Sequence, residues 1–441
     1  MIEKAVNSEV QQLLDSNDFL WATGIEDTFI AQPWTKTGRT LDEYELTAHY
    51  DRYQEDSELI ASLGVKHARY GIPWYRIQPE PNKWDWGWAD DVLESLTSRG
   101  VQPILDLMHY GTPAWLTGSF ADPDYPQRVA DYAQAAAERY GKAIRWYTPL
   151  NEARITAYYC GRIGWWPPNL RGWPGFVSVM MGVAKGIALS QERIKKAVPN
   201  CVIAHVDACD IYSTQDPTLE AECQLRQEMV YLATDLITGR VTENHPLMPW
   251  LTKNRVSHKD LDFLQGHGQN PDIIGLNLYP MFSQKKCVRT PRGVRFRMSY
   301  ASPSIINDIA HRHYERYKLP MFVSETATIG NVAKRAKWMH GSIAAVKQAR
   351  QGNVPLVGYT WWPLFSLVGW GYRQLGTYPM GKYVLDMGLW DLANKEPDPL
   401  KRAETPLVEE YRRIVKGGLE TVGPIGEGKT EHVQKLLHRR V

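Results

Sequence analysis

Two glutamates stand where they could cleave a glycosidic bond. Glu152 closes the run WYTPLNE (146–152), and Glu325 closes the run MFVSE (321–325). Both runs are mainly apolar and strand-like, so each carboxylate is expected at a strand end. Cleaving a glycosidic bond requires one carboxyl group that protonates the leaving oxygen and a second that stabilises or captures the oxocarbenium-like centre. This chemistry needs no metal and no organic cofactor, and we expect neither here.

The elements that would position these glutamates recur eight times. Stretches with apolar residues at helical spacing, such as DDVLESLTSRG (90–100), separate the strand-like runs. Strict alternation of strand and helix predicts a parallel sheet, and eight repeats predict a closed (β/α)₈ barrel. The eight runs are 19–26, 67–73, 102–108, 146–152, 202–208, 273–279, 321–325 and 357–363.

Polar residues fall late in these runs, at the end of the barrel that carries catalysis in this fold. Glu26, Asp106 and Asp207 have only this position in their favour, so a structural role is the favoured interpretation of each. The full set is Glu26, Arg69, Asp106, Glu152, Asp207, Asn277 and Glu325.

The chain is longer than a barrel requires. A barrel needs about 250 residues, and this chain has 441. Three long segments, 109–128, 153–175 and 281–302, are expected to be enlarged loops on the catalytic face. No linker divides the chain, so we predict a single barrel domain over 19–415, preceded by a polar segment (1–18) and followed by a tail (416–441).

Composition excludes several classes of partner. A net charge of +2 gives no case for nucleic acid, and no apolar run approaches the roughly 20 residues of a membrane span. The polar N-terminus lacks the apolar core of a signal peptide. The cysteines are odd in number and lack zinc-type spacing, which favours reduced thiols and a cytoplasmic protein; they are Cys160, Cys201, Cys209, Cys223 and Cys287.

Four motifs resemble glycoside hydrolase family 1, the β-glucosidase family of the retaining (β/α)₈ glycosidases. TPLNEA resembles its T-x-N-E-P motif, SETAT its T-E-N-G motif, RYGIPWYRIQPEP its R-F-S-I-S-W-S-R-I-x-P segment, and GYTWWPLFSLVGW its G-Y-x-x-W-S-L-L-D-N-x-E-W segment. They occur in the family's order, and the resemblance runs from about residue 19 to residue 411. The chain looks like a divergent member.

The resemblance implies a role for each matching residue. Glu325 would be the nucleophile and Glu152 the general acid/base of a retaining β-glycosidase acting on a small-molecule glycoside or oligosaccharide. Arg69, Asn151 and Tyr279 would support the nucleophile. The sugar would contact Asn151, His109, Trp362 and Trp370.

Two departures from the family concern the 4- and 6-hydroxyl side of the sugar. The family's Gln after the first strand is missing from WATGIEDT (21–28), and Gly369 replaces a Glu. An unpaired buried hydroxyl costs about 1–3 kcal/mol, so glucose should bind poorly unless Glu26, Asp27 or a loop group substitutes. Arg373 is a candidate anion contact there. We therefore expect a preference for sugars that are modified at position 4 or 6, or that lack a hydroxyl there.

The sequence leaves the role of one basic segment and the type of turnover open. The segment 285–297 holds six Lys or Arg and no acid; it is a solvated face, a contact for an anionic leaving group or sugar substituent, or a surface for an anionic partner. A transglycosidase would use the same residues as a hydrolase. A barrel that binds sugar without turnover is the rival interpretation outside enzymes.

Overall fold

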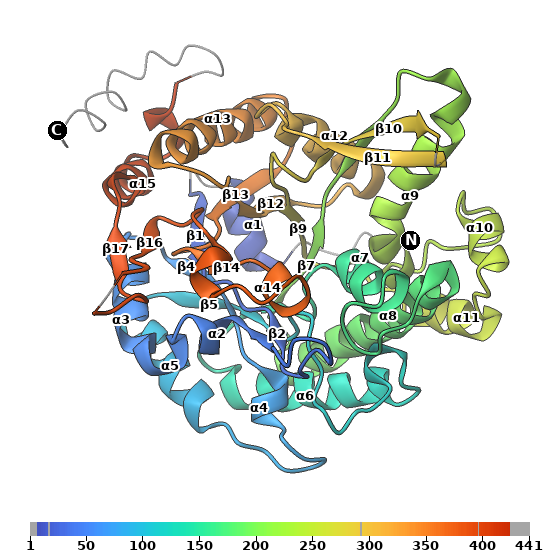
Figure 1. Ribbon diagram of the computed structural model, residues 1–441, viewed down its shortest axis with the longest axis horizontal. Helices are drawn as coiled ribbons and strands as arrows, with labels where there is room; N and C mark the ends of the chain where they lie inside the picture. The colour runs from blue at the N-terminus through green and yellow to red at the C-terminus, as the bar shows by residue number, and fades with distance from the viewer. Residues whose placement is uncertain (1–6, 16–17, 292, 396, 424–441) are drawn as a thin grey trace.

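The computed structural model describes residues 7–15, 18–291, 293–395 and 397–423. Eight parallel strands close into a barrel, in the order β1-β13-β12-β9-β7-β6-β5-β4 (Figure 1). All eight expected strands are confirmed, and so is the fold class. Their bounds are β1 (Leu20–Gly24), β4 (His67–Gly71), β5 (Gln102–Asp106), β6 (Trp146–Thr148), β7 (Val202–Ala208), β9 (Ile273–Asn277), β12 (Met321–Thr326) and β13 (Leu356–Trp361).

Helices surround the barrel on its outer side (Figure 1). Local sequence fixes several of their ends: the side chain of Asn331 caps α13 by accepting from the backbone N–H of Lys334, and that of Thr405 caps α15. The long helices are α3 (His49–Ser62), α5 (Gly87–Ser98), α6 (Tyr125–Tyr140), α8 (Gly172–Ala197), α9 (Glu220–Ile237), α11 (His258–Gly266), α12 (Ile305–Tyr317), α13 (Val332–Gln351) and α15 (Pro406–Gly417).

The surplus chain forms small elements around the barrel. The segment 281–302 contains a hairpin that pairs with β8 in a three-stranded sheet. The added strands are β2 (Phe29–Ile30), β3 (Leu41–Asp42), β8 (Ile211–Ser213), β10 (Gln284–Thr290), β11 (Gly293–Ser299), β14 (Leu367–Val368), β15 (Val384–Leu385), β16 (Trp390–Leu392) and β17 (Arg402–Glu404). The short helices are α2 (Glu43–Leu46), α4 (Trp74–Ile77), α7 (Ala153–Thr156), α10 (Met248–Lys253) and α14 (Gly371–Gln374), and a π-helical stretch, Ala157–Arg162, follows α7.

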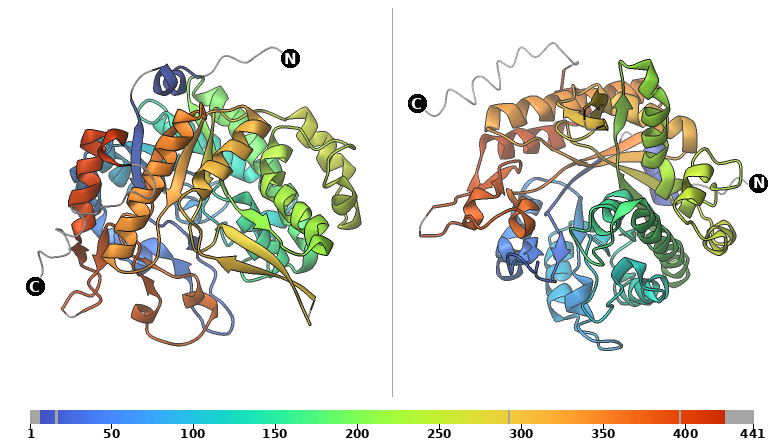
Figure 2. Two further views of the ribbon diagram at one scale, coloured as in Figure 1. Left: turned by 90° about the horizontal axis from the view of Figure 1, so that it is seen from above. Right: turned by 45° about the vertical axis from the view of Figure 1, so that its right-hand side comes forward.

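The N-terminal segment, expected to be polar, contributes apolar side chains to the barrel. It contains the helix α1 (Ser8–Asp15), whose Val10 is fully buried in the cluster of apolar side chains that fills the barrel interior. Leu13 and Leu14 pack against the same cluster. Figure 2 shows α1 at one end of the barrel and the β10–β11 hairpin at the opposite end. The helix therefore covers the end of the barrel away from the catalytic face.

The end of the domain also differs slightly from the prediction. The helix α15 runs to Gly417, past the expected boundary at residue 415. A short 3₁₀ turn, Leu419–Thr421, follows it. Most of the expected tail, residues 424–441, lies outside the described part of the chain.

Among the described helices, α8 alone has the length and mean hydropathy of a membrane span. Two-thirds (67%) of its most apolar window is buried inside the protein, where it packs against α6 and α9. These contacts are those of a core helix. The five cysteines are buried, and none of them forms a disulfide.

Candidate active site

Glu152 lies at the N-terminus of α7, directly beyond β6. Its backbone adopts a left-handed conformation (φ 50°), which is unusual for a residue other than glycine. Neighbouring strands hold it there: Asn151 N–H donates to Met108 O at 2.9 Å, and Glu152 N–H donates to Val206 O at 3.0 Å. The side chain is 6% exposed. This backbone geometry places the carboxyl group of Glu152 at the rim of the barrel.

Glu325 lies one residue before the end of β12, where the strand is irregular. The pairing with β9 shifts register between Val323 and Glu325, and the pairing with β13 shifts between Val323 and Thr326. Such bulges re-aim a side chain beside an active site. Glu325 is 4% exposed.

Two donors hold the carboxylate of Glu325, one on each oxygen. Arg69 Nη1 donates to Oε1 at 2.5 Å, and the hydroxyl of Tyr279 donates to Oε2 at 2.7 Å. Arg69 is fully buried and also donates to Asp106 at 2.6 Å. Arg69 from β4, Tyr279 just beyond β9 and Glu325 near the end of β12 thus meet as the sequence predicted. Asp106 forms an ion pair with Arg69, which agrees with the structural role that we expected for it.

A chain of hydrogen bonds connects the two glutamates. Asn151 Oδ1 accepts from Arg69 Nη2 at 3.0 Å and from Asn277 Nδ2 at 3.0 Å. Asn277 Nδ2 also donates to Glu152 Oε1 at 2.9 Å. The path from Glu325 to Glu152 therefore runs through Arg69, Asn151 and Asn277.

The environments of the two carboxyl groups differ in charge. Burial and then the negative charge of Glu325 raise the pKa of Glu152 to about 7, while hydrogen bonds from Tyr110 and Asn277 oppose the rise. Burial also raises the pKa of Glu325, but there the positive charge of Arg69 opposes it. The positive charge of Arg69 thus favours the ionised form of Glu325, whereas the charge of Glu325 disfavours the ionised form of Glu152.

His109 follows β5 and is held by three neighbours. Its Nδ1 lies 2.6 Å from Asp27 and 3.4 Å from Asp106, and its Nε2 lies 2.9 Å from Asn151 Nδ2. Because Asn151 Oδ1 already accepts two hydrogen bonds, Nδ2 is the donor and Nε2 the acceptor. The imidazole proton thus faces Asp27, whose pKa burial raises to about 6.

Asp27, Asp106 and His109 are also the one described cluster whose ligand atoms lie close enough together to hold a metal ion. The proton on His109 Nδ1 and the guanidinium of Arg69 already face its carboxylates. Each carboxylate of this cluster thus has an ion-pair contact, at 2.6 Å to Arg69 Nη2 for Asp106 and at 2.6 Å to His109 Nδ1 for Asp27.

Trp362 follows β13, and Glu26 fixes its ring. The indole Nε1–H donates to Glu26 Oε2 at 3.1 Å, and the hydroxyl of Thr28 donates to Glu26 Oε1 at 2.6 Å. The ring is close to parallel with that of His109 (4°). A Cβ atom at position 24 would collide with the ring, so Gly24 is required for this approach. Both carboxylate oxygens of Glu26 thus accept hydrogen bonds from protein groups, and one of these bonds fixes the ring of Trp362.

Trp370 belongs to an aromatic cluster with Tyr110, Tyr159 and Trp166, whose ring centroids lie 5.0–5.3 Å from its own. Tyr110 also donates a hydrogen bond to Glu152 Oε2. Sequence reasoning missed Tyr110 as a site residue; its adjacency to His109 was the only available signal. Asn277 was noted for its position but given no role.

Gly369, which stands where the family has a Glu, lies against the segment that contains β15. A Cβ atom there would lie 3.1 Å from Leu385 Cδ1 and 3.2 Å from Tyr383 O, so the strand β15 fills this side. A carboxyl group from elsewhere lies nearby: Glu43, fully buried, accepts from the N–H of Val368 at 3.0 Å. Burial, and then the charge of Glu26, raise its pKa well above the ordinary value. Sequence reasoning missed Glu43 as well.

Arg373, the candidate anion contact, lies among backbone carbonyl groups. Its guanidinium donates to Gln32 O at 2.8 and 3.1 Å and to Trp165 O at 2.7 Å. Burial lowers its pKa to about 10. These carbonyl groups engage three of the five guanidinium N–H groups.

The basic residues near Glu152 are partly neutralised. Arg154 and Lys285 both pair with Asp210, at 2.6 and 2.5 Å. Among the described residues, Lys286, Arg295 and Arg297 lie on the hairpin without an ion pair. Asp207 accepts from the N–H of Ala208 at 2.8 Å, which agrees with a structural role.

The chain is similar to known glycosidases over most of its length. The chain is 30% identical over 360 residues to β-glucosidase A of Thermotoga maritima, covering 74% of this chain and 80% of that protein. It is 22% identical over 426 residues to the aryl-phospho-β-D-glucosidase BglA of Bacillus subtilis, covering 85% and 86%.

The fold has close solved counterparts. The structure of a β-glucosidase from Thermotoga maritima in complex with glucoimidazole superimposes with a TM-score of 0.79 at 20% identity, covering 91% of this chain and 98% of that one. Residues 22–378 match the family model of glycosyl hydrolase family 1. The chain is a glycoside hydrolase and belongs to glycosyl hydrolase family 1.

Proposed function

We propose that this glycosidase hydrolyses β-glycosides with retention of anomeric configuration, by double displacement on Glu325 with Glu152 as general acid/base. The observation that carries the proposal is the unequal setting of the two carboxyl groups. Arg69 and Tyr279 favour the ionised form of Glu325, whereas burial and the charge of Glu325 favour the protonated form of Glu152. One nucleophile and one acid are what the first step needs.

In the first step, an oxygen of Glu325 forms a bond to the anomeric carbon as the glycosidic C–O bond breaks. The proton of Glu152 passes to the leaving oxygen, so the products are the free alcohol, a glycosyl ester on Glu325 and an ionised Glu152. Loss of the charge on Glu325 removes the repulsion that had kept Glu152 protonated. The same residue is thereby prepared to act as a base.

In the second step, Glu152 takes a proton from water while the water oxygen bonds to the anomeric carbon. The ester bond to Glu325 breaks, and both glutamates return to their starting states. This route requires the carboxyl groups to lie about 5–5.5 Å apart, too close for a water molecule between nucleophile and sugar.

We further propose how the sugar is held. Asn151 and His109 contact the 2- and 3-hydroxyls, Trp362 forms the platform under the ring, and Glu26 accepts from a hydroxyl further round the ring. Sugars that are altered at position 4 or 6, or that lack a hydroxyl there, are the preferred substrates. The carboxyl groups of Glu26 and Glu43 lie on this side, and backbone carbonyl groups take three of the five N–H groups of Arg373. Neutral sugars therefore suit it better than phosphorylated or carboxylated ones.

Two measurements test the mechanism together. Proton NMR of the first product formed from an aryl β-glycoside should show the β-anomer before mutarotation. Incubation with an activated 2-deoxy-2-fluoro-glycoside should add one glycosyl residue to the peptide that contains Glu325. An initial α-anomer, or a label on another residue, would refute the assigned mechanism.

A further inference from the structure

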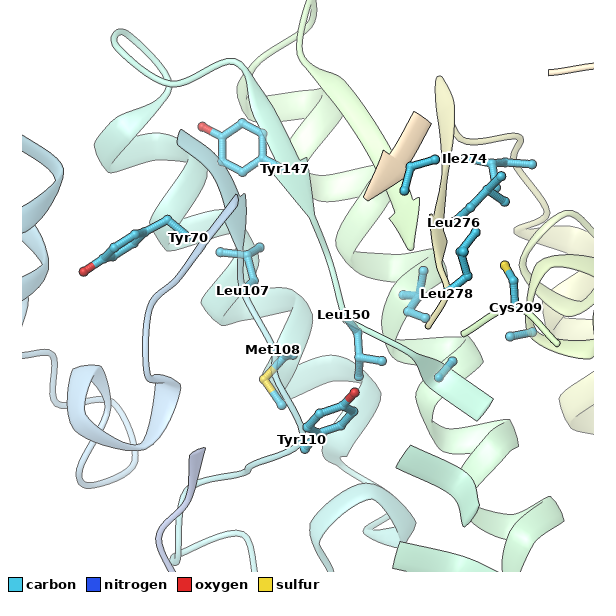
Figure 3. Close-up of a cluster of buried hydrophobic side chains, with 14 of the residues drawn as sticks. Tyr70, Leu107, Met108, Tyr110, Tyr147, Leu150, Cys209, Ile274, Leu276 and Leu278 are labelled. Carbon is cyan, nitrogen blue, oxygen red and sulfur yellow. The ribbon is translucent and has the colours of Figure 1, made fainter. Parts of the chain in front are cut away.

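Tyr110 touches the proposed acid/base directly. Its hydroxyl donates to Glu152 Oε2 and accepts from Asn151 Nδ2 at 3.1 Å. The side chain is 2% exposed. In Figure 3 its ring lies near Leu150, with the hydroxyl oxygen pointing toward that side chain. The phenol is therefore aimed at the segment that leads into Glu152.

The surroundings of Tyr110 give the hydroxyl a fixed position. The backbone has a φ of 71°, a region that bulky residues rarely adopt. The preceding residue, His109, is held by a hydrogen bond from Phe29 N–H to its carbonyl at 3.1 Å. The ring is packed against Trp166 and Trp370, with centroids 5.0 and 5.3 Å away. The phenol therefore has little freedom to turn away from Glu152.

The direction of the proton follows from the neighbouring donors. Asn151 Oδ1 accepts from Arg69 and Asn277, so Asn151 Nδ2 presents an N–H to the oxygen of Tyr110. The hydroxyl proton of Tyr110 must then point to Glu152. The other oxygen of Glu152 accepts from Asn277 at 2.9 Å. Each oxygen of the acid/base thus faces one donor.

We infer that Tyr110 is a positioning residue that fixes the orientation of Glu152 and stabilises its carboxylate form. The inference rests on the proposed role of Glu152. A hydrogen bond to a carboxylate is stronger than one to a neutral carboxyl group, so the contact strengthens as Glu152 releases its proton to the leaving oxygen. Tyr110 thereby makes Glu152 a stronger acid than its burial alone would allow.

The first test is the variant Tyr110→Phe, which keeps the ring and removes the hydroxyl. Loss of the bond raises the pKa of Glu152, so the fall of kcat/KM at alkaline pH should move upward by about one pH unit. Phenyl glycosides, which need acid assistance, should react about tenfold more slowly. Dinitrophenyl glycosides, which leave without a proton, should change by less than about threefold. A uniform loss on both substrates with an unmoved pH profile would overturn the inference.

The matched control is Tyr132→Phe. Tyr132 is fully buried, and its hydroxyl donates to a carbonyl oxygen, that of Ile72, at 3.2 Å. This variant measures how turnover changes when a buried phenol hydroxyl elsewhere in the protein is lost. This variant should leave both the pH profile and the ratio of the two substrates as in the unmodified protein.

A second variant covers the case in which Tyr110→Phe does not fold. Site-specific incorporation of 3-fluorotyrosine at position 110 makes the phenol a stronger donor, so the alkaline fall of kcat/KM should move to lower pH, opposite to Tyr110→Phe. A profile that stays in place would contradict the inference. Labelling of Glu325 by the 2-deoxy-2-fluoro-glycoside is measured in the unmodified protein and tests the double displacement alone. The pH profiles of the variants at position 110 test the role of Tyr110, so the two proposals can be refuted separately.

Discussion

The guanidinium of Arg69 lies 2.5 Å from the carboxylate of Glu325, and neither side chain is more than 5% exposed. The same guanidinium is 2.6 Å from Asp106. One buried cation therefore stands between two buried carboxylates that come from different strands. Both the stability of the barrel mouth and the ionisation of the proposed nucleophile depend on it.

Replacing Arg69 by Met should affect both properties. Removing one partner of a buried ion pair costs about 3–5 kcal/mol of unfolding free energy, to be measured by urea denaturation. We expect kcat/KM to fall at least about 100-fold because Glu325 loses its charge stabilisation. Arg139→Met, which breaks the exposed pair with Asp90, is the control and should cost at most about 1 kcal/mol. Equal losses of unfolding free energy in the two variants would show that the buried ion pair contributes no more to stability than the exposed one.

Substitutions of the two glutamates should separate their roles. Glu325→Gln should abolish turnover with the fold intact, because it removes the nucleophile's charge alone. Glu152→Ala should retain slow turnover of substrates with good leaving groups, and azide should accelerate it by forming a glycosyl azide, since this small anion needs no general base. The measurements are nitrophenol release and mass spectrometry of the product. Near-normal activity of Glu325→Gln would mean that the roles are misassigned.

The buried carboxyl group of Glu43 should make stability depend on pH. Its pKa in the folded protein is raised well above 4.5, so the folded state binds the proton more tightly than the unfolded state. Its contribution is complete at acid pH and is lost as the pH rises above about 4.5, with a slope of up to about 1.4 kcal/mol per unit.

The variant Glu43→Gln, which carries no titratable group, should lack this loss. Its unfolding free energy relative to that of the unmodified protein should rise between about pH 5 and about pH 8. Glu45→Gln, an exposed position in the same helix, serves as the control and should show no such trend. A pH-independent difference between Glu43→Gln and the unmodified protein would contradict a protonated Glu43.

The sugar panel tests the proposed specificity. We expect kcat/KM for the aryl β-galactoside, β-fucoside or β-xyloside to exceed that for the β-glucoside. The glucuronide and 6-phosphoglucoside should be poor substrates, because the carboxylate of Glu26 repels an anion and three of the five N–H groups of Arg373 already donate to carbonyl groups. A glucoside preferred by tenfold or more would refute the first expectation. A preferred 6-phosphoglucoside would refute the second.

Much of this architecture could be predicted from the chain because the barrel converts sequence order into spatial order. Short apolar runs at regular intervals define the strands, and a polar residue late in a run must lie on the catalytic rim. Arg69, Asn151, Asn277 and Glu325 meet for this reason.

The contacts that sequence did not predict come from loops, where position in a strand gives no guidance. Tyr110 reaches Glu152 through a left-handed backbone that its sequence does not signal. Glu43 accepts a hydrogen bond from the N–H of Val368, which lies more than three hundred residues later in the sequence. Arg373 lies four residues from Gly369, but its loop turns the guanidinium toward carbonyl groups of two other segments.

The contacts of Arg373 have a consequence for how this barrel can diverge. One guanidinium ties the loop after β13 to the loops after β1 and β6 by donating to the backbone carbonyls of Gln32 and Trp165, and it also lies over the ring of Trp34, 5.5 Å from its centroid. Gln32 and Trp165 can change identity without breaking the junction. Side chains at the mouth of the barrel can therefore change while the loops keep their positions. Because backbone carbonyl groups accept these hydrogen bonds, an alignment of side chains would not reveal the contacts that hold the loops.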